Sequence, residues 1–117
     1  MIKNSHYIDY ILDLLLPLGN IKAKKMFGGY GIYKDNIFFA LVIDNILYFK
    51  VGDNNRSQYD SFDSKPFSYE GKNKKIVTMS YWEVPIDILE DNTKLTQWVQ
   101  HAVRAASNAK KQNKKLT

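Results

Sequence analysis

The spacing of hydrophobic residues changes along the chain, and the changes mark the expected elements. From Ile8 to Leu16 apolar residues recur every three or four positions, which predicts a helix ended by Pro17 and Gly19. A second stripe of this kind predicts a C-terminal helix capped by Asp91 or Asn92, and consists of Leu95, Trp98, Val99, Ala102, Val103 and Ala106. Because each helix is apolar on one side only, each should pack against a sheet.

Between these helices the pattern is typical of strands. It predicts a first strand at about 24–33, then strands at 37–43 and 46–51 joined by Asp-Asn turns, and later strands at 66–69 and 76–84. A short helix is expected between the third and fourth strands. The order is therefore α-β-β-β-α-β-β-α. Because strands joined by hairpins are antiparallel, the predicted fold class is a two-layer α+β domain with an antiparallel sheet.

Composition is consistent with this single domain and limits its chemistry. The chain has 117 residues, 44% of them hydrophobic, and contains no cysteine, which excludes disulfides, thiolate metal sites and a cysteine nucleophile. We expect residues 1–109 to form the domain and residues 110–117 to form a basic flexible tail. No signal-peptide pattern and no membrane-spanning apolar run is visible, so a cytoplasmic location is expected.

The net charge of +5 is distributed unevenly, because all 12 acidic residues lie before Asn92. Six basic residues follow that point: Lys94, Arg104, Lys110, Lys111, Lys114 and Lys115. Basic residues on a helix and its tail can contact nucleic-acid phosphates, so these six are the candidate nucleic-acid contacts. The alternative is a solvated terminus that promotes solubility.

Three of the six glycines fall within four residues, in the segment Gly28-Gly29-Tyr30-Gly31. Exposed backbone N–H groups here could bind phosphate with help from Lys24 and Lys25. A phosphate-binding loop, however, needs a Gly-Lys-Ser/Thr ending and a following helix, and neither is present. The favoured interpretation is structural, a β-bulge or a close backbone contact.

Other candidate chemistry is sparse. The two histidines, His6 and His101, lie at opposite ends of the sequence, and neither a nucleophile-elbow motif nor a pair of catalytic carboxylates stands out. No catalytic residue, metal or cofactor is therefore expected. Six aromatic residues could stack nucleic-acid bases if they shared an open sheet face near lysines, although core packing is favoured. They are Tyr30, Tyr33, Phe38, Phe39, Tyr48 and Phe49.

Several segments in order resemble the N-terminal domain of TfoX/Sxy proteins. They lie at 25–33, 39–42, 47–50, 66–69, 79–85 and 98–106, and the match runs from about His6 to Lys111. The first segment opens with the motif Lys25, Met26, Phe27, Gly28, Gly29, Tyr30 and Gly31. The resemblance implies a secretion-chaperone-like α+β fold. In longer members of this family a helix-hairpin-helix-like domain follows, and we expect this sequence to stop where that domain begins.

The resemblance also implies a role in bacterial natural competence. Members of the family are positive regulators of DNA-uptake genes, together with the cyclic-AMP receptor protein. The expected function is a non-enzymatic regulatory or adaptor domain that acts by protein contact, with a transcription factor of that type as partner. Two alternatives stay open: direct nucleic-acid binding through the basic C-terminal helix and tail, and an enzyme or small-ligand protein with a pocket between helix and sheet.

Overall fold

The computed structural model describes residues 3–26 and 28–116, with side chains described for residues 6–26 and 28–111. Its helices are α1 (Lys3–Leu15), α2 (Ile86–Leu89) and α3 (Asn92–Leu116), with 3-10 helices η1 (Leu16–Leu18), η2 (Arg56–Phe62) and η3 (Lys72–Lys74). Its strands are β1 (Ile21–Met26), β2 (Gly29–Lys34), β3 (Ile37–Ile43), β4 (Ile46–Lys50), β5 (Pro66–Glu70) and β6 (Ile76–Glu83). The predicted α+β class is confirmed.

The six strands form one antiparallel sheet in the order β1-β2-β3-β4-β6-β5. Strand β3 is interior, as its apolar sequence predicts, and its residues from Phe39 to Ile43 are all buried. The Asp35-Asn36 and Asp44-Asn45 turns have positive φ at both central residues, between 50° and 68°. This is the backbone of two-residue type I′ hairpins, which Asp and Asn tolerate.

The predicted single strand at 24–33 is wrong. The segment is a hairpin in which β1 pairs with β2, and Met26 lies opposite Gly29. Gly28 has a φ of +75°, a conformation that glycine adopts without steric strain. Phe27 lies outside the described residues. The adjacent glycines are a turn signal at this point, so the sheet has six strands where the sequence pattern predicted five.

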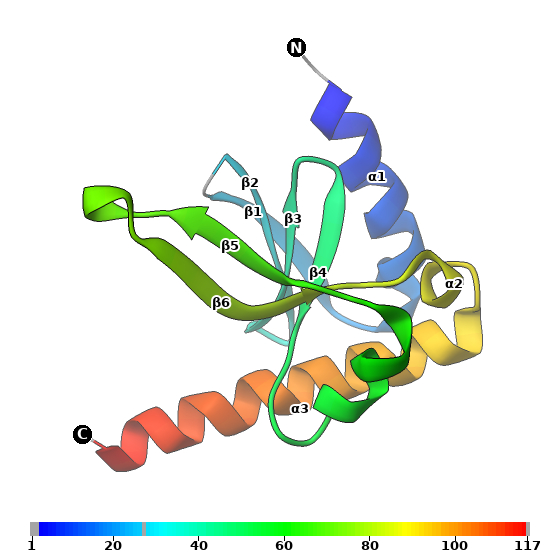
Figure 1. Ribbon diagram of the computed structural model, residues 1–117. Coiled ribbons are helices and arrows are strands. Elements are labelled where there is room, and N and C mark those ends of the chain that lie inside the picture. Colours follow the sequence, from blue (N-terminus) through cyan, green and yellow to red (C-terminus); the bar gives the residue numbers. More distant parts are fainter. Residues whose placement is uncertain (1–2, 27, 117) are drawn as a thin grey trace.

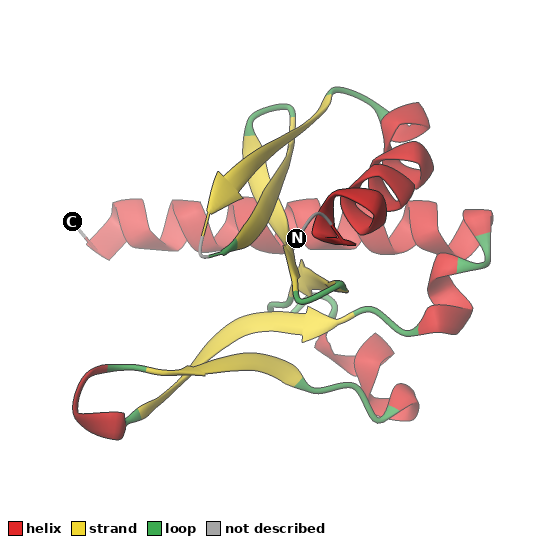
Figure 2. Cartoon of the chain, turned by 90° about the horizontal axis from the view of Figure 1, so that it is seen from above, coloured by secondary structure: helices red, strands yellow, loops and turns green. Residues whose placement is uncertain are grey.

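The main core lies between the sheet and the helices α1 and α3. The predicted stripes supply it, with Ile11 and Leu15 from α1 and Val99 from α3 all at most 1% exposed. Tyr59 of η2 extends this core, since its ring centroid lies 4.6 Å from that of Trp98. Helix α3 runs along the sheet, and the β5–β6 hairpin projects beyond the rest of the sheet, away from α1 (Figures 1 and 2).

A bulge in β3 shifts the alternation of its side chains between the two faces of the sheet. Ile32 pairs with Ala40 and Tyr33 with Phe38, which leaves Phe39 as the extra residue. Phe39 therefore joins the main core, whereas Phe38 points to the opposite face. A second apolar cluster lies on that face, formed by buried Leu41, Ile43 and Tyr81 with partly buried Met26, Phe38, Tyr48, Phe67 and Met79.

Helix α3 begins as the sequence predicts and ends later. Asp91 caps it, because its Oδ1 accepts a hydrogen bond from the Lys94 N–H at 3.1 Å. The helix continues to Leu116, beyond Ala109, where the apolar stripe stops. The residues after Ala109 are mostly Lys and Gln, which have high helix propensity and can extend a helix already formed. The flexibility of residues 110–117 stays a prediction.

The C-terminal end of α3 and the tip of the β5–β6 hairpin project to the same side (Figure 1).

Candidate interaction sites

The glycine motif is packed within the sheet. A Cβ atom at Gly29 would overlap the backbone carbonyl oxygen of Val42 in β3, and one at Gly31 would lie 2.5 Å from Cε of Met26. Both glycines are buried, and β2 pairs with a strand on each side. These positions support a structural role for the motif, in which the glycines allow close backbone contact with a neighbouring strand. Tyr30 packs against the main core, and Lys25 is exposed.

The structure separates the candidate nucleic-acid contacts into groups. Arg104 and Lys111 are exposed and lie seven residues apart, about two helical turns, so they share one outward face of α3. Lys110 is exposed on a different side of the helix. Lys94 is in the first turn, about 15 Å from Arg104 along the axis. The side chains of Lys114 and Lys115 lie outside the described residues.

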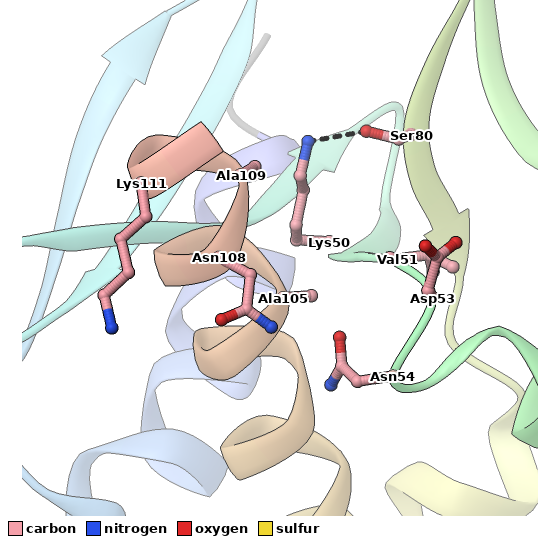
Figure 3. A pocket seen from close by; sticks show the side chains of 10 residues that line it. Lys50, Val51, Asp53, Asn54, Ser80, Ala105, Asn108, Ala109 and Lys111 are labelled. Atoms are coloured by element: carbon pink, nitrogen blue, oxygen red, sulfur yellow. Dashed lines mark hydrogen bonds between the residues drawn. The ribbon is translucent and has the colours of Figure 1, made fainter. Parts of the chain in front are cut away.

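A pocket with a volume of about 680 Å³ lies between the loop after β4 and the C-terminal half of α3 (Figure 3). Its polar lining includes Lys50, Asp53, Ser80, Asn108 and Lys111. The Lys50 Nζ donates a hydrogen bond to Ser80 Oγ at 2.6 Å. Figure 3 shows the Lys111 side chain extending away from this pair, so the two ammonium groups do not converge on one point.

A buried asparagine organises the loop that lines this pocket. Asn55 is 1% exposed; its Oδ1 accepts a hydrogen bond from Gly52 N at 2.8 Å, and its Nδ2 donates to Lys50 O at 3.0 Å. Asn54 Nδ2 donates to the backbone oxygen of His101 in α3 at 3.1 Å. These bonds hold the loop against α3. The sequence shows only a polar loop here, and nothing in it indicates that Asn55 is buried.

Lys50 is the cation that sequence reasoning missed. Burial lowers the pKa of its amino group. The salt bridge found among the described side chains joins Lys34 to Asp35 at 3.3 Å, so within that part of the chain Lys50 has no carboxylate partner. Its sequence position, at the end of an apolar strand, is an indication of partial burial that could have drawn attention to it.

The Lys50–Ser80 pair also has the residue types of a base and a nucleophile. A serine nucleophile needs backbone donors to stabilise an oxyanion, and two nearby N–H groups are already used. Val51 N donates to Ser80 O, and Gly52 N donates to Asn55, both at 2.8 Å. The arrangement therefore favours a structural or ligand-binding role over catalysis.

The six aromatic residues considered for base stacking divide between the faces of the sheet. Tyr30, Phe39 and Phe49 belong to the main core. Phe38 and Tyr48 belong to the second cluster, and the Tyr33 ring stacks on Phe38 with centroids 5.2 Å apart. Half of the set therefore lies on the sheet face opposite the main core.

The β5–β6 hairpin carries exposed apolar side chains. Ile76 is 67% exposed, Tyr69 46% and Val77 37%, and Tyr69 lies opposite Val77 in the strand pairing. Strand β5 is an edge of the sheet, so its outer backbone groups are free to pair with another chain. The connecting turn is basic, with Lys72, Lys74 and Lys75.

Two further types of site were considered. Across the described side chains, no group of three or more His, Asp and Glu residues is placed to hold a metal ion. His6 and His101 are both exposed, and His101 Nδ1 lies 2.9 Å from Gln58 Oε1. Among the helices the structure describes, none is long and apolar enough to cross a membrane.

Comparison with known proteins identifies the family. Residues 13–106 match the TfoX N-terminal domain. The chain is 32% identical over 93 residues to the DNA transformation protein TfoX of Haemophilus influenzae, covering 78% of this chain and 42% of that protein. It is 28% identical over 83 residues to the DNA transformation protein TfoX1 of Aliivibrio fischeri, covering 71% of this chain and 39% of that protein. The chain thus spans about two-fifths of the length of these relatives. It belongs to the TfoX N-terminal domain family.

Proposed function

We propose that this chain is a non-enzymatic regulatory domain that promotes natural competence by contacting another protein, and that it acts in the cytoplasm. Family membership supports the regulatory role, since the matched relatives are named DNA transformation proteins. The observation that carries the contact is the projecting hairpin with its exposed Tyr69, Ile76 and Val77. By the family resemblance, the partner is a transcription factor of the cyclic-AMP receptor type.

The hairpin has the physical features of a protein-binding element. Its apolar side chains lose contact with water when a partner covers them, which supplies a driving force proportional to the buried area. Its edge strand β5 offers backbone donors and acceptors that fix the register of an added segment. The lysines of the turn favour a partner surface with acidic residues.

The test measures binding of the purified chain to the purified cyclic-AMP receptor-type regulator of the same cell by calorimetry. We expect Ile76→Ser to weaken binding. Ile86→Ser is a matched control, because Ile86 is also 67% exposed but lies in α2, outside the hairpin. The absence of binding by the unmodified chain, or equal effects of the two substitutions, would reject the proposed contact.

The non-enzymatic part of the proposal has its own test. If the Lys50–Ser80 pair were catalytic, the chain would turn over ester substrates and Ser80→Ala would abolish the turnover. We expect no turnover above that of the Ser80→Ala variant. A serine-directed phosphonate that labels Ser80 stoichiometrically would contradict the proposal.

Direct nucleic-acid binding through α3 is the second candidate, favoured by the shared outward face of Arg104 and Lys111. It predicts an affinity that falls as salt rises and that falls again when residues 110–117 are deleted. Electrophoretic mobility shifts with a duplex measure both effects. Unchanged affinity after the deletion would exclude the tail.

A further inference from the structure

A row of aromatic rings crosses the sheet on the face opposite the main core, with a lysine at each end. The Lys50 Nζ lies 5.1 Å from the centroid of the Tyr81 ring, and Tyr81 lies 5.4 Å from Phe38. Phe38 is stacked 5.2 Å from Tyr33, and the Lys24 Nζ lies 5.1 Å from the Tyr33 centroid. The five residues come from five different strands, β4, β6, β3, β2 and β1. The row is therefore a product of the strand register.

A pocket of about 370 Å³ lies over this row. Tyr33, Phe38 and Tyr81 line it together with Lys50, and the C-terminal half of α3 contributes Ala106, Ala109 and Lys110. Tyr81 is buried, whereas Tyr33 and Phe38 are only partly buried, and all three line the pocket. The volume falls in the range of pockets that hold small aromatic ligands.

The charges around this pocket are positive. Lys50 and Lys110 both line it, and Lys24 lies beyond Tyr33. No carboxylate is found among its lining residues. Asp35 directly precedes the lining residue Asn36, and its carboxylate forms a salt bridge with Lys34 at 3.3 Å. A ligand that is flat, aromatic and negatively charged would match both the rings and the lysines.

We propose that this pocket binds one nucleotide of a single-stranded nucleic acid, with the base against Tyr33 and Phe38 and the adjacent phosphates at Lys50 and Lys110. Stacking on aromatic side chains beside a basic groove is the usual way in which proteins hold single strands. A duplex does not fit, because its bases are stacked on one another and are not free to enter the pocket. An acidic peptide would satisfy the lysines but would leave the rings unused.

The site is separate from the protein contact proposed above. The hairpin residue Ile76 is not among the pocket residues, and Tyr33 and Phe38 are not on the hairpin. Ile76→Ser should therefore leave oligonucleotide binding unchanged, and a pocket variant should leave binding to the protein partner unchanged. The two proposals can fail independently.

The test is fluorescence anisotropy with a labelled oligothymidylate of about 15 nucleotides. We expect the Tyr33→Leu/Phe38→Leu double variant, which keeps apolar side chains but removes both rings, to bind at least about tenfold more weakly. Lys110→Gln, at an exposed position where folding is not at risk, should weaken binding about twofold to fivefold. Tyr69→Leu and Lys65→Gln, the latter at another exposed lysine, are matched controls outside the pocket, and each should bind within about twofold of the unmodified chain.

Several outcomes would overturn the proposal. They are an absence of oligonucleotide binding, equal loss in the pocket and control variants, equal affinity for a duplex of the same length, and equally effective competition by poly-glutamate of matched charge. The first would remove the site. The second and third would indicate non-specific electrostatic attraction between the basic protein and the phosphates, and the last would indicate an acidic peptide as the ligand. If the double variant does not fold, the comparison of Lys110→Gln with Lys65→Gln decides the question.

Discussion

Replacing Gly29 with alanine tests the idea that the family motif serves the packing of the sheet. A Cβ at this position would overlap the carbonyl oxygen of Val42 and would lie 3.1 Å from both the carbonyl carbon of Val42 and Cγ1 of Ile43. Val42 is part of β3, which is held by hydrogen bonds to β2 and β4. Relief of the overlap therefore requires movement of a central strand.

The expected loss of folding stability depends on which atoms must move to make room for the new Cβ. Forcing extra volume into a packed site costs about 1–3 kcal/mol, and Gly29→Ala should lie at the upper end because the obstacle is backbone. Gly31→Ala should lie at the lower end, about 1 kcal/mol, since the nearest atoms are the flexible thioether of Met26, at 2.5 and 2.7 Å. Gly28→Ala meets no atom within 4 Å and loses about 1 kcal/mol through its positive φ alone.

Urea denaturation of the three variants measures these differences. A loss of about 3 kcal/mol is a large share of a typical stability of 5–15 kcal/mol, and corresponds to a fall of about 10 °C in the melting temperature. The reasoning would be refuted if the Gly29→Ala variant were as stable as the Gly28→Ala variant, or more stable.

Other predictions concern the loop, the cap and the buried tyrosine. Asn55→Ala should destabilise the fold by about 2–3 kcal/mol in urea, because it removes two hydrogen bonds and leaves their partners unpaired; an unchanged midpoint would contradict the assigned bonds. Asp91→Ala should remove about 1 kcal/mol by loss of the α3 cap, whereas Asp91→Asn, which can also cap, should be nearly neutral. Burial raises the Tyr81 pKa from 10.0 to about 12, so its neutral form stabilises the fold below pH 10 and this contribution is lost as pH rises through 12. Tyr81→Phe should reduce the fall in melting temperature across this interval, and an identical fall would show that Tyr81 does not titrate there.

Local patterns in the sequence determined much of the fold. The apolar stripes of α1 and α3 identify their buried faces because a helix repeats every 3.6 residues, whatever it packs against. The Asp-Asn pairs identify two turns because these residue types tolerate a positive φ. The wholly apolar β3 identifies the centre of the sheet. The spaced segments also sufficed to predict the family, which the comparison confirms.

The candidate sites were decided by the tertiary structure. The bulge at Phe39 places Phe39 on the same face as Ala40 and Phe38 on the other face, and strict strand alternation does not reveal where a bulge falls. The register of several strands brings Tyr81 beside both Phe38 and Lys50, although Tyr81 lies far from them in sequence. Periodicity is a local property, whereas a pocket depends on which strands become neighbours and in which register. For this reason the sequence supplied the aromatic and basic residues, and only the folded sheet selected the ones that share a site.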